Sequence, residues 1–186
     1  PVGAGLGGGS SDAACVLRSL PRLFDAEVPE DTLQNIALTL GSDVPFFLLG
    51  SSVYAEGRGE VMEPIDLPLP YWIVLVTPDI HVSTPWAYQR LSEQRNGKFP
   101  ARPRMKDRLL PSPLQAVLTA ENDFEGIVFE EHAAIKTIKE QLTEFGALHS
   151  LMSGSGSSMF GLFYDKVTAL KAAEFFANKH FVHVTE

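Results

Sequence analysis

Apolar residues recur along the chain with two spacings, one typical of helices and the other of strands. Helical spacing predicts helices over residues 30–40, 114–118, 124–145 and 167–179, and two more around the apolar residues of 16–24 and 86–91. Apolar runs rich in β-branched and aromatic residues predict strands over residues 52–56, 60–65, 71–76, 147–152, 159–164 and 181–184. The pattern therefore predicts a chain that mixes helices with strands.

Two of the predicted helices have a clear apolar face. In the helix that opens near Ser10, Pro21 is expected to cause a kink or an early end, and the residues expected to pack inward are Val16, Leu17, Leu20, Leu23 and Phe24. In the helix over residues 124–145, they are Ile127, Val128, Ile135, Ile138 and Leu142. Cys15 lies among small apolar neighbours and is expected to be a buried small hydrophobe.

The domain organisation is indicated by prolines. Pro64, Pro68 and Pro70 cluster just before the strand predicted over residues 71–76 and mark the passage from a first lobe to a second. We therefore predict one lobe over residues 1–66 and another over residues 67–186. No internal repeat is evident.

Composition excludes several classes of protein. A net charge of −8 argues against nucleic-acid partners, because there is no domain-wide positive field to attract phosphates. No apolar run is long enough to span a membrane and no signal-peptide pattern opens the chain, so no membrane partner is expected. The single cysteine excludes an intrachain disulfide framework and fits a reducing compartment.

The opening stretch, PVGAGLGGGSSDAA, holds five glycines between residues 3 and 9 and runs into an apolar helix. Glycines at this density allow positive φ values and bring several N–H groups close to one anion. A loop of free amides at a helix N-terminus typically binds phosphate. A flexible linker is the alternative, although linkers rarely lead straight into an apolar helix.

Two familiar phosphate loops fit this stretch poorly. The Walker pattern requires a lysine after the last glycine, where this chain has Ser10. Gly3, Gly5 and Gly8 satisfy the dinucleotide pattern G-x-G-x-x-G. The match is weak, because a stretch with five glycines between residues 3 and 9 satisfies many such patterns by chance. That pattern also requires a strand soon after the helix, and an acidic loop over residues 24–31 follows instead.

Asp43, in the sequence GSDVPFFLLG, allows two interpretations. The aspartate is either an N-cap that satisfies the free amides of the apolar turn after it, or a catalytic carboxylate at the edge of an apolar wall that desolvates it. The residues alone leave both open.

Five stretches together resemble the GHMP small-molecule kinases, whose glycine loop lacks the Walker lysine. They are PVGAGLGGGSSDAA at the start, GSDVPFF from Gly41, GRGE from Gly57, NDFE from Asn122 and SGSGSS from Ser153. The resemblance covers the whole chain. It implies an α+β fold of two lobes, the first similar to domain 2 of ribosomal protein S5 and the second ferredoxin-like.

The resemblance also implies an activity. It is strongest for the branch that transfers phosphate from ATP, with Mg²⁺, to the 2-hydroxyl of 4-diphosphocytidyl-2-C-methyl-D-erythritol in non-mevalonate isoprenoid synthesis. A homoserine or mevalonate kinase and a non-catalytic nucleotide-binding domain stay open as alternatives. The expected partner is a small molecule, and the expected location is the cytoplasm, or the plastid in a plastid-bearing organism. A monomer and a homodimer both stay open.

Site residues follow from the same resemblance. It implies that Asp43 is the catalytic base and that Thr84 and Tyr88 face the substrate, with the Tyr88 ring stacked on cytosine. The third-motif loop, Ser153, Gly154, Ser155 and Gly156, would help to shape the transfer site, although on its own it could be a hairpin turn. The phosphates of ATP would be bound by Gly3, Ala4, Gly5, Leu6, Gly7, Gly8, Gly9, Ser10 and Ser11.

Two further expectations concern the rest of the chain. The sequence opens without Met and without a strand before the glycine loop, so we expect a preceding N-terminal segment. The resemblance implies that this segment carries a catalytic lysine and the adenine pocket. Residues 90–108 hold seven basic side chains against two acids and are expected to form a mobile surface excursion, or to guide a polyanionic substrate.

Overall fold

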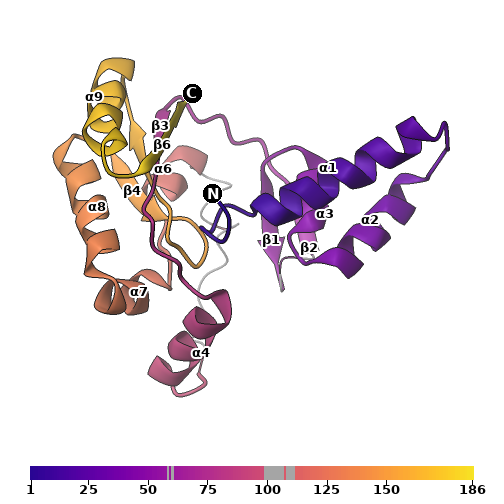
Figure 1. Cartoon of the computed structure of the whole chain (residues 1–186), viewed down its shortest axis with the longest axis horizontal. Coiled ribbons are helices and arrows are strands. Elements are labelled where there is room, and N and C mark those ends of the chain that lie inside the picture. The colour runs from indigo at the N-terminus through magenta and orange to yellow at the C-terminus, as the bar shows by residue number, and fades with distance from the viewer. Residues whose placement is uncertain (58, 60, 99–106, 108–111) are drawn as a thin grey trace. The chain divides into compact units, whose positions relative to one another are not determined.

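The computed structural model describes residues 1–57, 59, 61–98, 107 and 112–186, and it divides the chain into two compact units (Figure 1). The N-terminal unit comprises Val2 and Gly7–Leu67, and the C-terminal unit comprises Pro1, Gly3–Leu6 and Pro68–Glu186. Part of the first glycine loop therefore belongs to the C-terminal unit, although it lies at the opposite end of the sequence.

The N-terminal unit packs three helices around a small core and adds a two-stranded sheet. Its elements are α1 (Gly8–Leu23), α2 (Glu30–Leu40), α3 (Val44–Leu49), β1 (Val53–Glu56) and β2 (Val61–Pro64). The strands pair antiparallel, with Val53 opposite Pro64. The buried core of the three helices consists of Ala14, Ala37, Val44 and Leu48. The predicted helix over residues 30–40 is confirmed, and the strands predicted over residues 52–56 and 60–65 are found as β1 and β2.

The predicted inward face of α1 is wrong. Of its five residues, only Leu17 packs against the core of the unit, and Val16, Leu20, Leu23 and Phe24 are exposed. The helix instead packs through Ala13, Ala14 and Leu17, which lie in the core shared with α2 and α3. Cys15 is exposed as well, so the expected burial of its thiol is also wrong. Pro21 lies inside the helix, which ends two residues later.

The C-terminal unit is a four-stranded antiparallel sheet in the order β4-β5-β3-β6. The strands are β3 (Trp72–Thr77), β4 (His149–Met152), β5 (Met159–Phe163) and β6 (Phe181–Thr185). The helices are α4 (Thr84–Gln94), α6 (Pro113–Leu118), α7 (Glu125–Glu131), α8 (Ala133–Glu144) and α9 (Lys166–Ala177). Helices between β3 and β4, a hairpin, and α9 before β6 give the ferredoxin-like βαββαβ order.

One face of this sheet forms the main core. Because side chains alternate along a strand, Val74 and Val76 of β3 lie on the same face as Met159 of β5 and Met152 of β4, and all four are buried. Helices α8 and α9 cover that face (Figure 1). The approach is close at Gly161, where an added Cβ would lie 3.2 Å from Leu142 of α8.

The long helix predicted over residues 124–145 is two helices. Its five inward residues are buried as predicted, but the backbone leaves helical geometry at His132, with φ −126° and ψ 73°, between α7 and α8. The break lets α8 follow β4 and β5 while α7 packs against α4, where the imidazole of His132 meets the ring of Trp86. Tertiary packing therefore overrides the continuous helical pattern, which contains no glycine or proline at that point.

Candidate functional site

Gly5 lies against the loop of residues 153–158, which we call the Gly/Ser loop. Gly5 has a φ of +77°, and an added Cβ would lie 2.1 Å from the carbonyl oxygen of Ser153 and 2.9 Å from that of Gly156. The hydroxyl of Ser153 donates to the Gly5 carbonyl oxygen at 2.8 Å, and the N–H of Ser158 donates to that of Ala4 at 3.1 Å. The two glycine-rich stretches are therefore joined at backbone distance, and only glycine fits at position 5.

The remainder of the first glycine loop starts α1. Gly7 is the N-cap residue in the left-handed region, with a φ of 65°, so the helix begins two residues before the predicted Ser10. The first intrahelical bond runs from Ser11 N–H to the Gly7 carbonyl oxygen at 2.8 Å. The N–H groups before it have no carbonyl partner within a helix. Gly8 and Gly9 are exposed, and a Cβ at Gly9 would meet nothing within 4 Å, so this helix start is open to an anion.

Asp43 precedes the first residue of α3 and does not cap it. Its side chain makes no capping hydrogen bond, so the N-cap interpretation is wrong. The carboxylate is exposed and accepts from the Ser42 hydroxyl at 3.4 Å, so the chain as described does not desolvate it. Phe47 lies four residues later, on the same side of α3, and its ring lies 2.8 Å from where a Cβ of Gly7 would be. The side of α3 that carries Asp43 therefore faces the start of α1.

Thr84 and Tyr88 lie on the first turns of α4. The Thr84 hydroxyl is hydrogen-bonded to the hydroxyl of Ser155 at 2.8 Å, which connects α4 to the Gly/Ser loop. The Tyr88 ring is 61% exposed and meets the Phe124 ring edge-on, with centroids 4.9 Å apart and planes at 75°. Tyr88 is thus an exposed aromatic side chain that is fixed on one side by a second ring.

The Gly/Ser loop closes the β4–β5 hairpin, so it is a hairpin connection as well as a neighbour of Gly5. Ser155, Gly156, Ser157 and Ser158 are buried. Their hydroxyls have partners: Ser157 donates to the Ile80 carbonyl oxygen, and Ser158 is hydrogen-bonded to the Thr77 hydroxyl at 2.8 Å. The loop is held by side chains along its whole length.

Sequence reasoning missed the roles of Asn122 and Glu125. In the structure, Asn122 Nδ2 donates to the carbonyl oxygens of Met152 and Gly154, and Glu125 Oε1 accepts from the N–H of Met152. The only sequence signal was the position of NDFE among the five resembling stretches.

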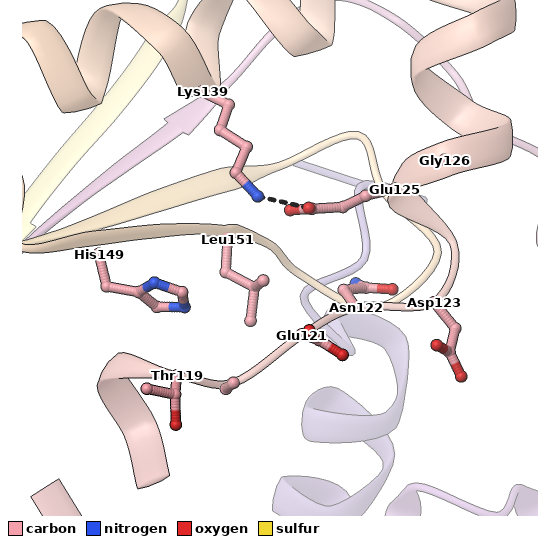
Figure 2. Close-up of a pocket in the computed structure, with 10 residues that line it drawn as sticks. Thr119, Glu121, Asn122, Asp123, Glu125, Gly126, Lys139, His149 and Leu151 are labelled. Carbon is pink, nitrogen blue, oxygen red and sulfur yellow. Dashed lines mark hydrogen bonds and ion pairs between the residues drawn. The ribbon is translucent and has the colours of Figure 1, made fainter. Parts of the chain in front are cut away.

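Glu125 also lines a pocket of about 630 Å³ behind the Gly/Ser loop (Figure 2). Its carboxylate forms an ion pair with Lys139 of α8. His149 of β4 lines the same pocket, and burial together with the charge of Lys139 lowers its pKa, while the Ala120 backbone and Glu125 oppose the shift. Its Nε2 atom is buried and has no hydrogen-bond partner among the described residues.

Within the described ranges, no group of three or more His, Cys, Asp or Glu side chains could hold a metal ion. No helix in the described part of the chain is long and apolar enough to cross a membrane. Of residues 90–108, expected to form a mobile or guiding basic segment, 90–94 are the last turns of α4, so the predicted excursion is wrong for them. Residues 99–106 and 108 of the same segment lie outside the described residues.

The predicted site residues thus fall into two sets. In the C-terminal unit, hydrogen bonds connect Gly5 to Ser153 and Thr84 to Ser155, and Tyr88 lies on the same helix as Thr84. In the N-terminal unit, the glycines that open α1 lie on the side of α3 that carries Asp43. The contacts within each set all lie inside one unit.

Family models match both parts of the chain. The model for the GHMP kinase N-terminal domain matches residues 1–51, and the model for the GHMP kinase C-terminal domain matches residues 112–183. The predicted resemblance and the predicted α+β fold class are thereby confirmed.

The chain is also similar to several named proteins and solved structures. The chain is 45% identical over its full length to a 4-diphosphocytidyl-2-C-methyl-D-erythritol kinase of Chlorobium phaeobacteroides, and 45% identical over 94% of its length to one of Geobacter sulfurreducens. It spans 66% and 61% of these relatives. A crystal structure of 4-(cytidine 5'-diphospho)-2C-methyl-D-erythritol kinase superposes with a TM-score of 0.82 at 37% identity, over 99% of this chain and 66% of the other. A homoserine kinase from Cytophaga hutchinsonii shares the fold. It is 17% identical and superposes with a TM-score of 0.66, over 100% of this chain and 66% of the other.

Proposed function

Because the chain belongs to the GHMP kinase family, we propose that it is the larger part of an ATP-dependent kinase that phosphorylates the 2-hydroxyl of 4-diphosphocytidyl-2-C-methyl-D-erythritol. The choice of substrate is supported by two relatives at 45% identity that carry this name. The likenesses to homoserine and mevalonate kinases, at 17% and 18% identity, support the fold alone.

The amides of Gly3 to Ser11 would bind the phosphates of ATP. Support comes from the open start of α1, where Gly8 and Gly9 leave the first N–H groups uncovered. Backbone N–H groups and the positive end of the helix dipole together favour an anion there. Mg²⁺ would be held mainly by phosphate oxygens and water, as is usual for this ion when it binds with a nucleotide.

Asp43 would accept the proton of the substrate hydroxyl, or orient its oxygen for attack on the γ-phosphorus. One observation supports this proposal. The Asp43 carboxylate is exposed and makes no capping hydrogen bond, and it lies on the side of α3 that carries Phe47, whose ring contacts Gly7. A carboxylate that made a structural cap could not take a proton without loss of the helix start. General-base assistance contributes typically about 10²–10⁴-fold to the rate. Positioning and electrostatic stabilisation of the transferred phosphoryl group would supply the rest.

Thr84 and Tyr88 would bind the cytidyl part of the substrate. The exposed Tyr88 ring offers a flat surface for stacking, and its contact with Phe124 restricts its rotation. The Ser153–Gly156 part of the Gly/Ser loop would shape the phosphate site through its contact with Gly5. The partner in this proposal is a small molecule, and we place the reaction in the cytoplasm.

The test is Asp43→Asn in the full-length protein, with phosphoryl transfer and ATP affinity measured in parallel. We expect kcat to fall by about 10²–10⁴-fold while the dissociation constant of ATP is unchanged, because the substitution removes a proton acceptor and keeps the shape of the side chain. Asp31→Asn is the matched control, since Asp31 is also an exposed aspartate at the start of a helix of the same unit.

Wild-type turnover in Asp43→Asn would exclude the proposed role. An equal loss in Asp31→Asn would mean that the substitutions act through folding. Faster transfer to homoserine or mevalonate than to the cytidyl substrate would favour another GHMP kinase, and ATP binding without transfer would favour a non-catalytic domain.

A further inference from the structure

Three residues of the segment Asn122 to Glu125 contact the proposed site in the C-terminal unit: Asn122 and Glu125 bind the strand end and loop at Met152 and Gly154, and Phe124 contacts Tyr88. We propose that Asn122 and Glu125 are positioning residues that fix the Gly/Ser loop against Gly5, and that Phe124 fixes the Tyr88 ring. This inference rests on the proposed function, because it assigns these residues to the reaction described above. None of them would touch the transferred phosphate.

Asn122 connects the segment to the loop through a single amide group. Nδ2 donates to the carbonyl oxygen of Met152 at 2.8 Å and to that of Gly154 at 2.7 Å, while Oδ1 accepts from the N–H of Phe124 at 2.9 Å. Only an amide can donate twice and accept once in this geometry, because an aspartate side chain has no donor when ionised. The residue type is therefore dictated by the loop.

Glu125 holds the other polar group of Met152. Its Oε1 accepts from the Met152 N–H at 2.9 Å, and its carboxylate is paired with Lys139 of α8, as Figure 2 shows. The side chain of Glu125 is only 15% exposed, so a charge there requires a partner. Met152 is the last residue of β4, and both its N–H and its carbonyl oxygen are bound by side chains from this one segment.

The position of the loop matters because Gly5 has no room to adjust. The carbonyl oxygens of Ser153 and Gly156 lie so close to Gly5 that a methyl group does not fit, and Ser153 donates to the Gly5 carbonyl oxygen. A shift of Met152 and Gly154 would therefore move the backbone of Gly5, within the loop proposed to bind ATP. Misplacement of reacting groups by about 1 Å can cost about 100-fold in rate.

Phe124 acts on the other side of the segment. Its ring meets the Tyr88 ring edge-on with centroids 4.9 Å apart, a preferred aromatic geometry. If Tyr88 stacks on the cytosine ring, Phe124 controls how well that surface is held before the substrate arrives. The segment then affects turnover through Asn122 and Glu125, and substrate affinity through Phe124.

The experiment compares five variants of the full-length protein by kcat, KM and hydrogen exchange. Asn122→Asp, which loses both donors, should lower kcat by about 10–100-fold with little change in either KM, and should speed amide exchange over residues 153–158. Phe124→Leu should raise KM for the cytidyl substrate by about 2–12-fold and leave kcat and KM for ATP unchanged. Asp123→Asn is the control, since Asp123 belongs to the same segment but pairs with Arg95 at 2.9 Å. Its kcat should stay at the wild-type value.

Two Glu125 variants keep the test valid if Asn122→Asp does not fold. Glu125→Gln retains an oxygen that can accept from Met152 N–H, whereas Glu125→Ala does not, so kcat should be largely retained in the first and fall in the second. Any of three results would overturn the inference. They are the same kcat in Glu125→Gln and Glu125→Ala, wild-type kcat and wild-type amide exchange in Asn122→Asp, and a loss of kcat in Asp123→Asn as large as that in Asn122→Asp. Hydrogen exchange separates it from the proposed function: faster exchange over residues 153–158 in a protein that transfers no phosphate would refute the function and keep the positioning role.

Discussion

Replacing Gly5 with alanine should destabilise the C-terminal unit. The new Cβ would lie 2.1 Å from the carbonyl oxygen of Ser153, a backbone atom that can move only with its loop. A residue other than glycine at a φ of +77° costs roughly 1–2 kcal/mol. Relief of the overlap would also break the Ser153–Gly5 and Ser158–Ala4 hydrogen bonds, each worth about 0.5–1.5 kcal/mol. The free energy of unfolding should therefore fall by about 2–5 kcal/mol.

Urea unfolding followed by tryptophan fluorescence measures this change, since both tryptophans of the sequence, Trp72 and Trp86, lie in the C-terminal unit. Gly9→Ala is the matched control in the same glycine-rich stretch. Its Cβ would meet nothing within 4 Å, and alanine is more stable than glycine inside a helix by about 0.5–1 kcal/mol. An unchanged urea midpoint in Gly5→Ala, or an equal decrease in both variants, would refute the reasoning, because the overlap with the Gly/Ser loop exists only at Gly5.

Two further predictions concern Tyr88 and His149. Tyr88→Ala should raise KM for the cytidyl substrate by about 5–150-fold, the range expected for the loss of one stacked base. Tyr88→Phe keeps the ring and should have the wild-type KM. An equal rise in KM for ATP, measured by steady-state kinetics, would instead indicate a structural role of Tyr88. Because burial and Lys139 lower the pKa of His149, the unfolded chain takes up its proton first as pH falls below 6.5. Stability should therefore be fully present above that pH and decline below it, and urea midpoints of His149→Gln should fall less than those of wild type between pH 7.5 and 5.5. Parallel profiles of the two proteins would contradict this role of His149.

Much of the secondary structure could be predicted because it is encoded locally. The helix over residues 30–40 has acids in its first turn and Gly41 after its last residue, and the observed α2 has the same bounds. The apolar run after Pro70 became β3, the central strand that pairs with both β5 and β6. In these segments the period of the apolar residues and the flanking glycine and prolines suffice to define the element.

Two errors have a common physical cause. Val16, Leu20, Leu23 and Phe24 have helical spacing, but periodicity indicates an apolar stripe and does not state what packs against it. Ala13 and Ala14 of α1 lie in the core with α2 and α3 instead. The break at His132 likewise has no local signal, since it follows from α7 and α8 packing against different elements.

By itself, the sequence determined the order and type of the elements, the family resemblance and the residue types of the proposed site, since local propensity and short motifs carry that information. Only the tertiary structure decided that Gly5 is confined by the backbone of the Gly/Ser loop, that Asp43 does not cap α3, and that Asn122 and Glu125 bind Met152. Contacts between residues about 30 to 150 positions apart depend on how the chain folds back on itself, and neither periodicity nor composition encodes them.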